Sequence, residues 1–139
     1  MVQTFPDMDV VINNAGAIPR GDVLEMDDLS LRSSWELKVF GYINATRAYY
    51  QRMCERRDGV ILNIIGLGAE KLDYGYVAGS TGNAALVAFT RTVGSMSLDH
   101  GVRERVLTTN LQTRSQSKQG LFICLRCGVQ RKQTRLAHG

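Results

Sequence analysis

Short apolar runs alternate with longer amphipathic stretches along the first hundred residues of the chain. The run Val10-Val11-Ile12 and the segment 59–66 are almost wholly apolar, which is typical of parallel strands covered on both faces. Between them, apolar or small residues recur at steps of three and four positions, which predicts one side of a long helix ending near Arg56. The positions of this stripe are Leu31, Trp35, Val39, Tyr42, Thr46, Tyr49 and Met53.

Residues that favour helix ends bound this helix and a second one. The candidates for the N-cap of the first helix are Asp27, Asp28 and Ser30. The second helix is expected to begin behind Ser80 or Thr81 and to run to Asp99. It then ends at Gly101, because glycine adopts the left-handed conformation of a helix C-terminus at little cost. Each predicted helix therefore follows an apolar strand.

A third strand is predicted over 102–111, although Glu104 and Arg105 interrupt its apolar pattern. Alternating strands and helices predict the α/β class, here a partial Rossmann-like parallel sheet with flanking helices and right-handed crossovers. Strands as apolar as residues 10–12 are normally internal, and we expect this one to lack a neighbour. Its open edge would expose apolar side chains and unpaired backbone groups, which favours poor solubility or self-association.

The charge balance changes abruptly near Arg103. Residues 1–102 carry 9 Lys and Arg against 12 Asp and Glu, whereas residues 103–139 carry 8 against 1. This asymmetry predicts a folded domain over 1–103 and a poorly ordered basic tail over 104–139. A basic tail attracts polyanions, but these charges are scattered around a single aromatic residue, Phe122, so we expect no nucleic-acid partner.

Several protein classes are excluded by composition. No apolar run approaches the roughly 20 residues that cross a bilayer, so no membrane segment is expected. The three cysteines form no disulfide-rich pattern, which favours a reducing, cytoplasmic compartment. The Cys124-x-x-Cys127 pair has metal-ligand spacing, yet a structural zinc site needs four ligands, and only Cys54 and His138 could complete it. We therefore expect no metal site.

Four blocks in order carry a family resemblance. The strand end Asn13-Asn14-Ala15-Gly16 resembles the N-N-A-G motif of the short-chain dehydrogenases/reductases. The helix over 35–48 is similar to the long interface helix of that family, the segment 59–66 to its next strand, and the segment 83–91 to the helix that bears its lysine. The resemblance covers roughly residues 6–103. It implies an NAD- or NADP-dependent oxidoreductase acting on a small-molecule alcohol or ketone.

The resemblance also implies a cofactor edge and a partner surface. The residues that match the adenine and ribose side of the cofactor site, or end the next strand beside it, are Asn13, Asn14, Ala15, Gly16, Ile64 and Gly66. In the family the glycine-rich phosphate turn precedes this motif, so we expect half a cofactor site and an internal piece of a longer dehydrogenase. A small helix face, Ala84, Ala85 and Ala88, matches the family interface and implies a homodimer through the two long helices.

Catalytic residues are replaced at every matching position. The family uses serine, tyrosine, lysine and asparagine where this chain has Gly66, Gly79, Asn83 and Lys38 in turn. Glycine and amide groups exchange no proton at neutral pH, so we expect impaired or absent activity.

Three residues remain as substitute catalytic groups. Tyr76 is the nearest acid or base, with Ser80 one turn later, and Lys38 could supply a positive charge if it lay within ~4–6 Å of the phenol. A tyrosine in such a loop more often packs its ring and leaves its hydroxyl in water. The alternative is therefore a non-catalytic remnant or interaction domain that retains only the scaffold.

Overall fold

The protein is described by a computed structural model over residues 8–16, 18–109 and 121–125. Its sheet has the strand order β3-β2-β1-β4. The strands are β1 (Val10–Asn14), β2 (Gly59–Gly66), β3 (Val102–Thr109) and β4 (Leu121–Leu125). Strands β1, β2 and β3 are parallel, and β4 pairs antiparallel with β1. The predicted α/β class with a partial Rossmann-like sheet is confirmed.

The helices form one continuous rod and one separate helix. The rod consists of α1 (Asp28–Trp35), the π-helical turn η1 (Glu36–Phe40) and α2 (Gly41–Arg56). The separate helix is α3 (Val77–Ser97), and short 3-10 turns span Leu67–Ala69 and Leu98–His100. Asp27 caps α1 by accepting the backbone N–H of Ser30 at 2.8 Å, as one of the predicted alternatives. None of the described helices is long and apolar enough to span a bilayer.

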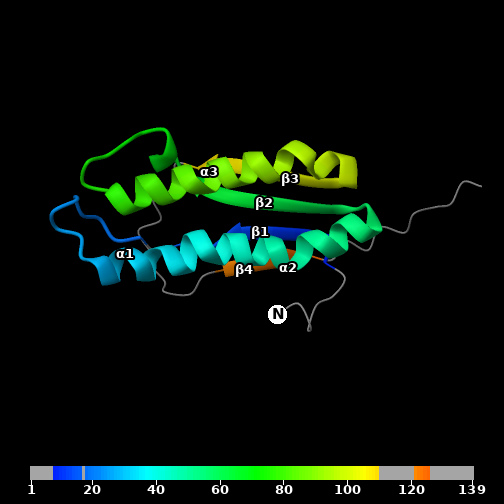
Figure 1. Ribbon diagram of the computed structural model, residues 1–139, viewed down its shortest axis with the longest axis horizontal. Coiled ribbons are helices and arrows are strands. Elements are labelled where there is room, and N and C mark those ends of the chain that lie inside the picture. Colours follow the sequence, from blue (N-terminus) through cyan, green and yellow to red (C-terminus); the bar gives the residue numbers. More distant parts are fainter. Residues whose placement is uncertain (1–7, 17, 110–120, 126–139) are drawn as a thin grey trace, which may run out of the picture.

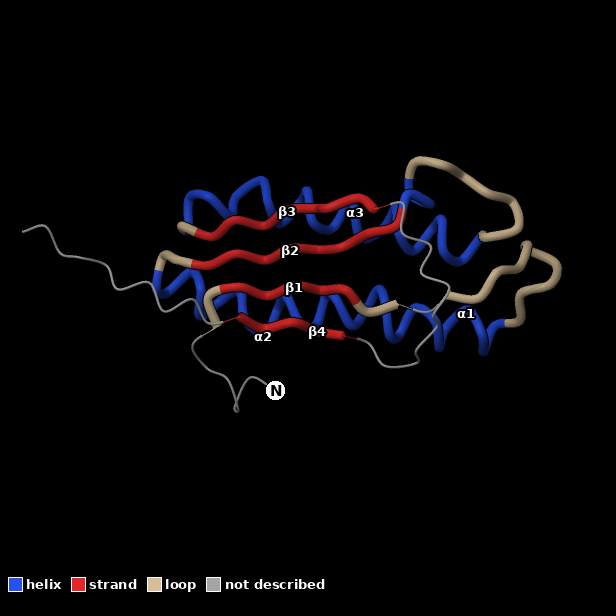
Figure 2. The backbone as a smooth tube through the Cα atoms, turned by 180° about the vertical axis from the view of Figure 1, so that it is seen from behind, coloured by secondary structure: helices blue, strands red, loops and turns tan. Residues whose placement is uncertain are grey.

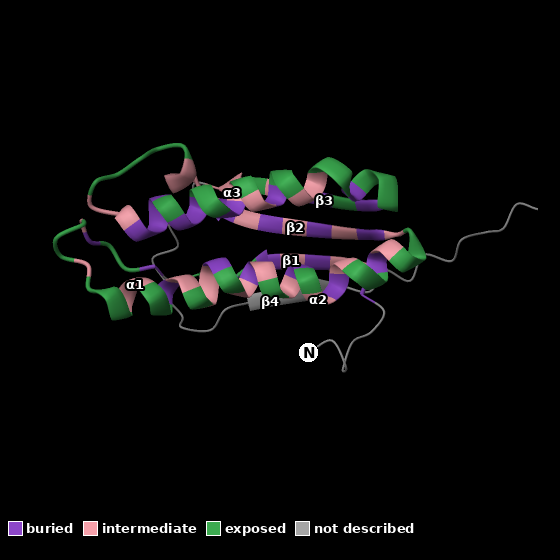
Figure 3. Cartoon of the chain, viewed as in Figure 1, coloured by how far each residue is buried: buried purple, intermediate pink, exposed green. Residues whose placement is uncertain are grey.

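All three α-helices lie on the same face of the sheet (Figures 1 and 2). Burial alternates along β2 accordingly, with Ile61 and Ile65 fully buried under the helices while Leu62 and Ile64 on the other face are only half-buried. Figure 3 shows the buried residues concentrated between helices and sheet. Within the described residues the second face of the sheet carries no helix.

Two clusters make up the core beneath the helices. One contains Met8, Val11, Tyr49, Met53, Ile61 and Val102. The other contains Ala15, Val39, Tyr42, Ile65 and Leu86. The predicted helix stripe supplies Val39, Tyr42, Tyr49 and Met53 to these clusters. Gly101 has φ +75° and lies against the Arg57 carbonyl oxygen, 2.3 Å from where a Cβ would stand, so the predicted left-handed glycine is required there.

Two expectations about the fold were wrong. Helix α3 begins at Val77 and not behind Ser80 or Thr81, because the backbone around Tyr76 is held by Gly21: the Val77 N–H donates to the Gly21 carbonyl at 3.2 Å. The strand predicted over 102–111 is present as β3, which runs from Val102 through Glu104 and Arg105 to Thr109. Strand β4 pairs with β1, so β1 does not have the open edge that was expected.

The structure describes only part of the expected basic tail. Residues 110–120 and 126–139 lie outside the described residues, and with them Cys127 and His138 of the weighed zinc site. Among the described residues no group of three or more His, Cys, Asp or Glu side chains could hold a metal ion.

Candidate functional site

The carboxyl ends of the parallel strands bring the candidate residues to one end of the molecule. Strand β1 leads into the N-N-A-G motif, β2 ends at Gly66, and the loop after it leads to α3 (Figure 1). Two loops are joined there, since the Gly21 N–H donates to the Gly75 carbonyl at 2.9 Å. In open parallel sheets this edge is where ligands bind.

The N-N-A-G motif alternates between buried and exposed positions. Asn13 is fully buried, and its Nδ2 donates to Asn63 Oδ1 at 2.7 Å. Ala15 is 1% exposed and packs in the core. Asn14 and Gly16 are exposed. The motif therefore offers Asn14 and the Gly16 backbone to a ligand, while Asn13 and Ala15 hold the strand under the helices.

A polar network lies inside the sheet next to this motif. Asn63 Nδ2 donates to Thr90 Oγ1 at 2.8 Å and to Glu104 Oε1 at 3.2 Å. Glu104 is only 2% exposed, and burial raises its pKa from 4.5 to about 7, partly opposed by the hydrogen bond from Asn63. This network was not predicted from the sequence, because Glu104 was interpreted only as an interruption of the apolar pattern of a strand.

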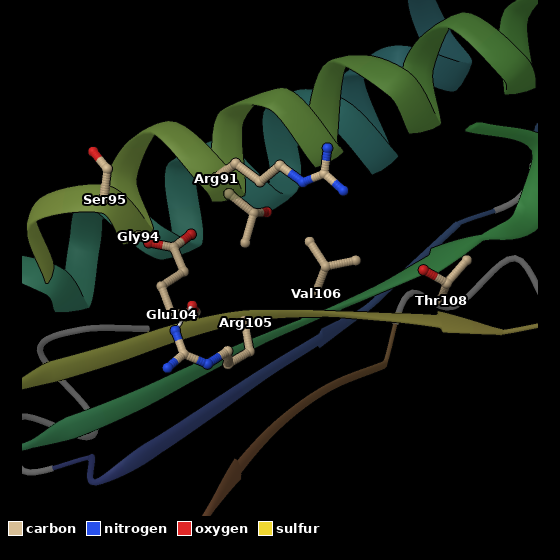
Figure 4. Close-up of a pocket in the computed structure, with 8 residues that line it drawn as sticks. Arg91, Gly94, Ser95, Glu104, Arg105, Val106 and Thr108 are labelled. Carbon is tan, nitrogen blue, oxygen red and sulfur yellow. Dashed lines mark hydrogen bonds between the residues drawn. The ribbon is translucent and has the colours of Figure 1, made fainter. Parts of the chain in front are cut away.

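A shallow groove of about 450 Å³ runs between α3 and β3 beside Glu104. Figure 4 shows the Glu104 side chain rising from β3 towards Gly94 on α3, with Arg91 further along the helix. This groove lies along the sheet edge formed by β3 and is separate from the candidate residues Tyr76, Ser80 and Lys38, none of which lines it.

The end of β2 shows how the replaced serine position is used. A Cβ on Gly66 would stand 3.2 Å from Asn83 Nδ2, so the Asn83 amide fills the space beside Gly66. Asn83 is 2% exposed, and its Oδ1 accepts no hydrogen bond from the described residues. Ile64 is half-buried, and its carbonyl accepts the Tyr42 hydroxyl at 2.9 Å.

The Tyr76 ring packs over Gly79, the position at which the resemblance led us to expect the family's tyrosine. A Cβ on Gly79 would stand 1.9 Å from the Tyr76 Cζ, so the ring lies where a side chain at position 79 would begin. The Arg20 guanidinium lies 5.8 Å from the ring centroid. Burial raises the pKa of the Tyr76 phenol, and the positive charge of Arg20 only partly opposes this. Arg20 is a residue that sequence reasoning missed.

Ser80 and Lys38, the other two candidates, differ in their surroundings. Ser80 is 5% exposed, and its hydroxyl has no hydrogen-bond partner among the described residues. Lys38 lies in the π-helical turn, 5.4 Å from the centroid of the Tyr42 ring. Burial lowers the pKa of its amine from 10.5 to about 8. The cation that the structure places against the Tyr76 ring is Arg20.

Comparisons with known proteins agree with this architecture. The family model for short chain dehydrogenases matches residues 1–119. A 3beta-hydroxysteroid dehydrogenase 2 from Eggerthella lenta is 31% identical over 81% of this chain and 44% of its own. A crystal structure of a short-chain dehydrogenase from Streptomyces avermitilis is 32% identical with a TM-score of 0.70, covering 77% of this chain and 39% of its own.

A third similar protein, the structure of ElxO with NADP bound, has a TM-score of 0.71 at 18% identity, covering 77% of this chain and 44% of its own, and shares the fold. The chain thus spans less than half the length of each of these three proteins. A parallel sheet flanked by helices, with the N-N-A-G motif at the carboxyl end of a strand, defines an oxidoreductase scaffold. The chain belongs to the short-chain dehydrogenase family.

Proposed function

We propose that this chain is a short-chain dehydrogenase/reductase domain that keeps one side of an NAD or NADP site but is impaired in, or incapable of, hydride transfer with an alcohol or ketone. The observation that carries the proposal is the packing of Tyr76 over Gly79. It fills the place of the family's proton donor with a phenol whose pKa is raised, whereas catalysis at neutral pH needs a lowered one.

The fit of the nicotinamide cofactor differs between the two sides of this edge. On the β1 side, Asn14 and Gly16 are exposed and fit the adenine and ribose portion. On the β2 side, the Asn83 amide lies against Gly66 and the Tyr76 ring against Gly79, so the places of the family's serine and tyrosine are filled. A bound dinucleotide would supply or accept the hydride, and neither Tyr76, with its raised pKa, nor the Ser80 hydroxyl offers the substrate oxygen an acidic proton donor.

Measurements of dinucleotide binding and of turnover test whether this site is active. The full chain is titrated with NADH and with NADPH by calorimetry, and turnover is measured with a panel of secondary alcohols and ketones. We expect weak or no dinucleotide binding and turnover at the background level. Tyr76→Phe should leave this result unchanged, with Tyr74→Phe as the matched control because Tyr74 is 66% exposed in the same loop. Turnover that Tyr76→Phe abolishes and Tyr74→Phe retains would refute the proposal.

The alternative role as an interaction domain rests on the surface of α3. Ala84, Ala85 and Ala88 are exposed, and small residues allow the close approach of another helix. We propose that a second copy of the chain packs on this face. Sedimentation of the full chain should give a dimer that Ala88→Glu converts to a monomer, with Ser95→Glu, also exposed on α3, as the control. A monomeric wild-type chain at micromolar concentration would contradict this.

We also propose a cytoplasmic location. Support comes from Cys54, which is a free cysteine in the structure and forms no disulfide, as expected in a reducing compartment. Imaging of a tagged full chain, with fractionation, tests this location, and secretion of the chain would overturn it.

A further inference from the structure

The amine of Lys38 is the one candidate group at this edge whose surroundings make it a nucleophile. Lys38 forms no ion pair or hydrogen bond with any described residue. Its amine contacts the face of the Tyr42 ring. Lysine side chains normally extend into water as charged ammonium groups, and those that are desolvated without a carboxylate are the ones used for covalent chemistry.

Two neighbours hold the Lys38 side chain against the end of β1. A Cβ on Gly16 would stand 2.9 Å from Cδ and 3.0 Å from Nζ of Lys38, so the stem lies directly over the Gly16 backbone. On the other side, Nζ lies 5.4 Å from the Tyr42 ring centroid. The Tyr42 hydroxyl is engaged with the Ile64 carbonyl, and burial raises its pKa further, so it stays neutral beside the amine. No described charge compensates an ammonium here.

The backbone around Lys38 is also unusual. The segment Glu36–Phe40 is π-helical, and the Gly41 N–H donates to the Glu36 carbonyl five residues earlier. Single π turns inside long helices occur frequently at functional sites, since they widen the helix and redirect a side chain. Lys38 as a whole residue is partly exposed, and the proposal below requires that a small ligand reach its amine.

We propose that Lys38 is a carbonyl-capturing nucleophile that forms an imine with small aldehydes and ketones at the end of β1. The neutral Nζ attacks the carbonyl carbon, a C–N bond forms, and a proton moves from nitrogen to oxygen to give a carbinolamine. Loss of water then leaves the C=N bond, with both hydrogens of the water coming from the amine. The step needs no oxidant, reductant or nicotinamide cofactor, so it goes beyond the proposed function and does not rest on it.

Burial supports this chemistry at physiological pH. With a pKa of about 8, about a quarter of the Lys38 amine is neutral at pH 7.5, against about one in a thousand for an ordinary lysine amine. The lowered basicity also makes the neutral nitrogen a weaker nucleophile. We therefore expect Lys38 to form the imine about fivefold or more faster than an exposed lysine, which is less than the full ratio of neutral fractions.

Reductive trapping tests the proposal on the full chain. The protein is incubated at pH 7.5 with propanal and cyanoborohydride, which converts the imine to a stable propyl amine, and modified peptides are counted by mass spectrometry over time. Lys71 in the loop after β2 is the internal control, because it is exposed. We expect Lys38 to be modified at least about fivefold faster than Lys71. Equal or slower modification of Lys38 would overturn the proposal.

Two variants sharpen the result. Lys38→Arg keeps the positive charge and removes the nucleophile, so the fast-labelled peptide should disappear while Lys71 labelling stays the same. Gly16→Ala places a methyl group where the Lys38 stem lies, so the advantage of Lys38 over Lys71 should shrink. If Gly16→Ala leaves the advantage intact in a chain with unchanged circular dichroism, the packing argument for the nucleophile is refuted.

Discussion

The interior of the sheet and its carboxyl edge differ in how far their buried polar side chains are joined by hydrogen bonds. In the interior, Asn63 joins Asn13, Thr90 and Glu104 through hydrogen bonds of 2.7–3.2 Å. In that network Asn13 Oδ1 and Glu104 Oε2 have no partner among the described residues, but each of the two side chains is held by its other polar atom. At the edge, the Asn83 Oδ1 and Ser80 Oγ atoms are buried with no partner among the described residues. Buried polar groups that stabilise a fold are normally paired. The hydrogen bonds of the interior network therefore support a structural role for it, and Asn83 Oδ1 and Ser80 Oγ at the edge take no part in that network.

Removal of Asn63 should produce the largest loss of stability. Asn63→Ala leaves the buried amide of Asn13 without its acceptor and the buried Thr90 and Glu104 side chains without their donor. Unpaired buried polar groups cost about 1–3 kcal/mol each, so we expect a loss of roughly 3–5 kcal/mol in the free energy of unfolding, measured with urea. Asn44→Ala on the exposed side of α2 is the control and should change little. A small loss for Asn63→Ala would mean that the network is not structural.

The second prediction concerns the pH dependence that Glu104 gives to stability. Its folded pKa of about 7 lies above its ordinary value of 4.5, so the folded chain holds the proton more tightly than the unfolded chain. Its contribution is therefore fully present below about pH 4.5 and is lost as pH rises to about 7. The expected loss is about 3 kcal/mol.

Urea unfolding at several pH values measures this effect. Glu104→Gln cannot titrate, so the difference in stability between wild type and variant should change across this range and stay constant above it. A difference that does not vary with pH would show that the Glu104 carboxylate is solvated in the folded chain.

Local signals predicted the parts of this molecule whose structure depends on nearby residues. The α1–α2 stripe, the Asp27 cap and the left-handed Gly101 are all legible in single stretches of sequence, and the structure contains each of them. The start of α3 was not predictable in this way, because Tyr76 makes no side-chain cap and Gly21, from a distant loop, fixes the backbone there.

Two features near the candidate site, the buried Glu104 and the packing of Tyr76, could not be predicted from the sequence for a similar reason. Glu104 interrupts an apolar pattern, and only its bond to Asn63, 41 positions away, explains how a carboxyl group lies inside β3. Gly79 stands out in the sequence only through the family resemblance, and the folded chain is needed to show that the Tyr76 ring packs over it. The family resemblance drew attention to position 79, and only the tertiary structure shows which side chain contacts it.

At the edge, Gly79→Ala should have a smaller effect than either interior change. Its new methyl group would meet the Tyr76 ring, which must swing away and lose its packing. We expect a loss of about 1–2 kcal/mol, in the range for overpacking a filled site. In the double variant Tyr76→Ala, Gly79→Ala the clash is gone, so the second substitution should cost nothing further. Additive losses in this double-mutant cycle would show that the ring does not rest on Gly79.

Arg20→Ala should give the smallest change and tests whether the edge uses charge for function. The Arg20–Asp73 ion pair is 2.5 Å long but has side chains 61% and 45% exposed, and such surface pairs contribute little to stability. We expect no measurable change in the urea midpoint. Loss of the nearby positive charge should, however, raise the pKa of the Tyr76 phenol further, seen as a later rise of tyrosinate absorbance in a pH titration. Tyr76→Phe identifies the affected component. An unchanged titration would mean that Arg20 does not act on the phenol, and it would leave the edge without any group that makes Tyr76 more acidic.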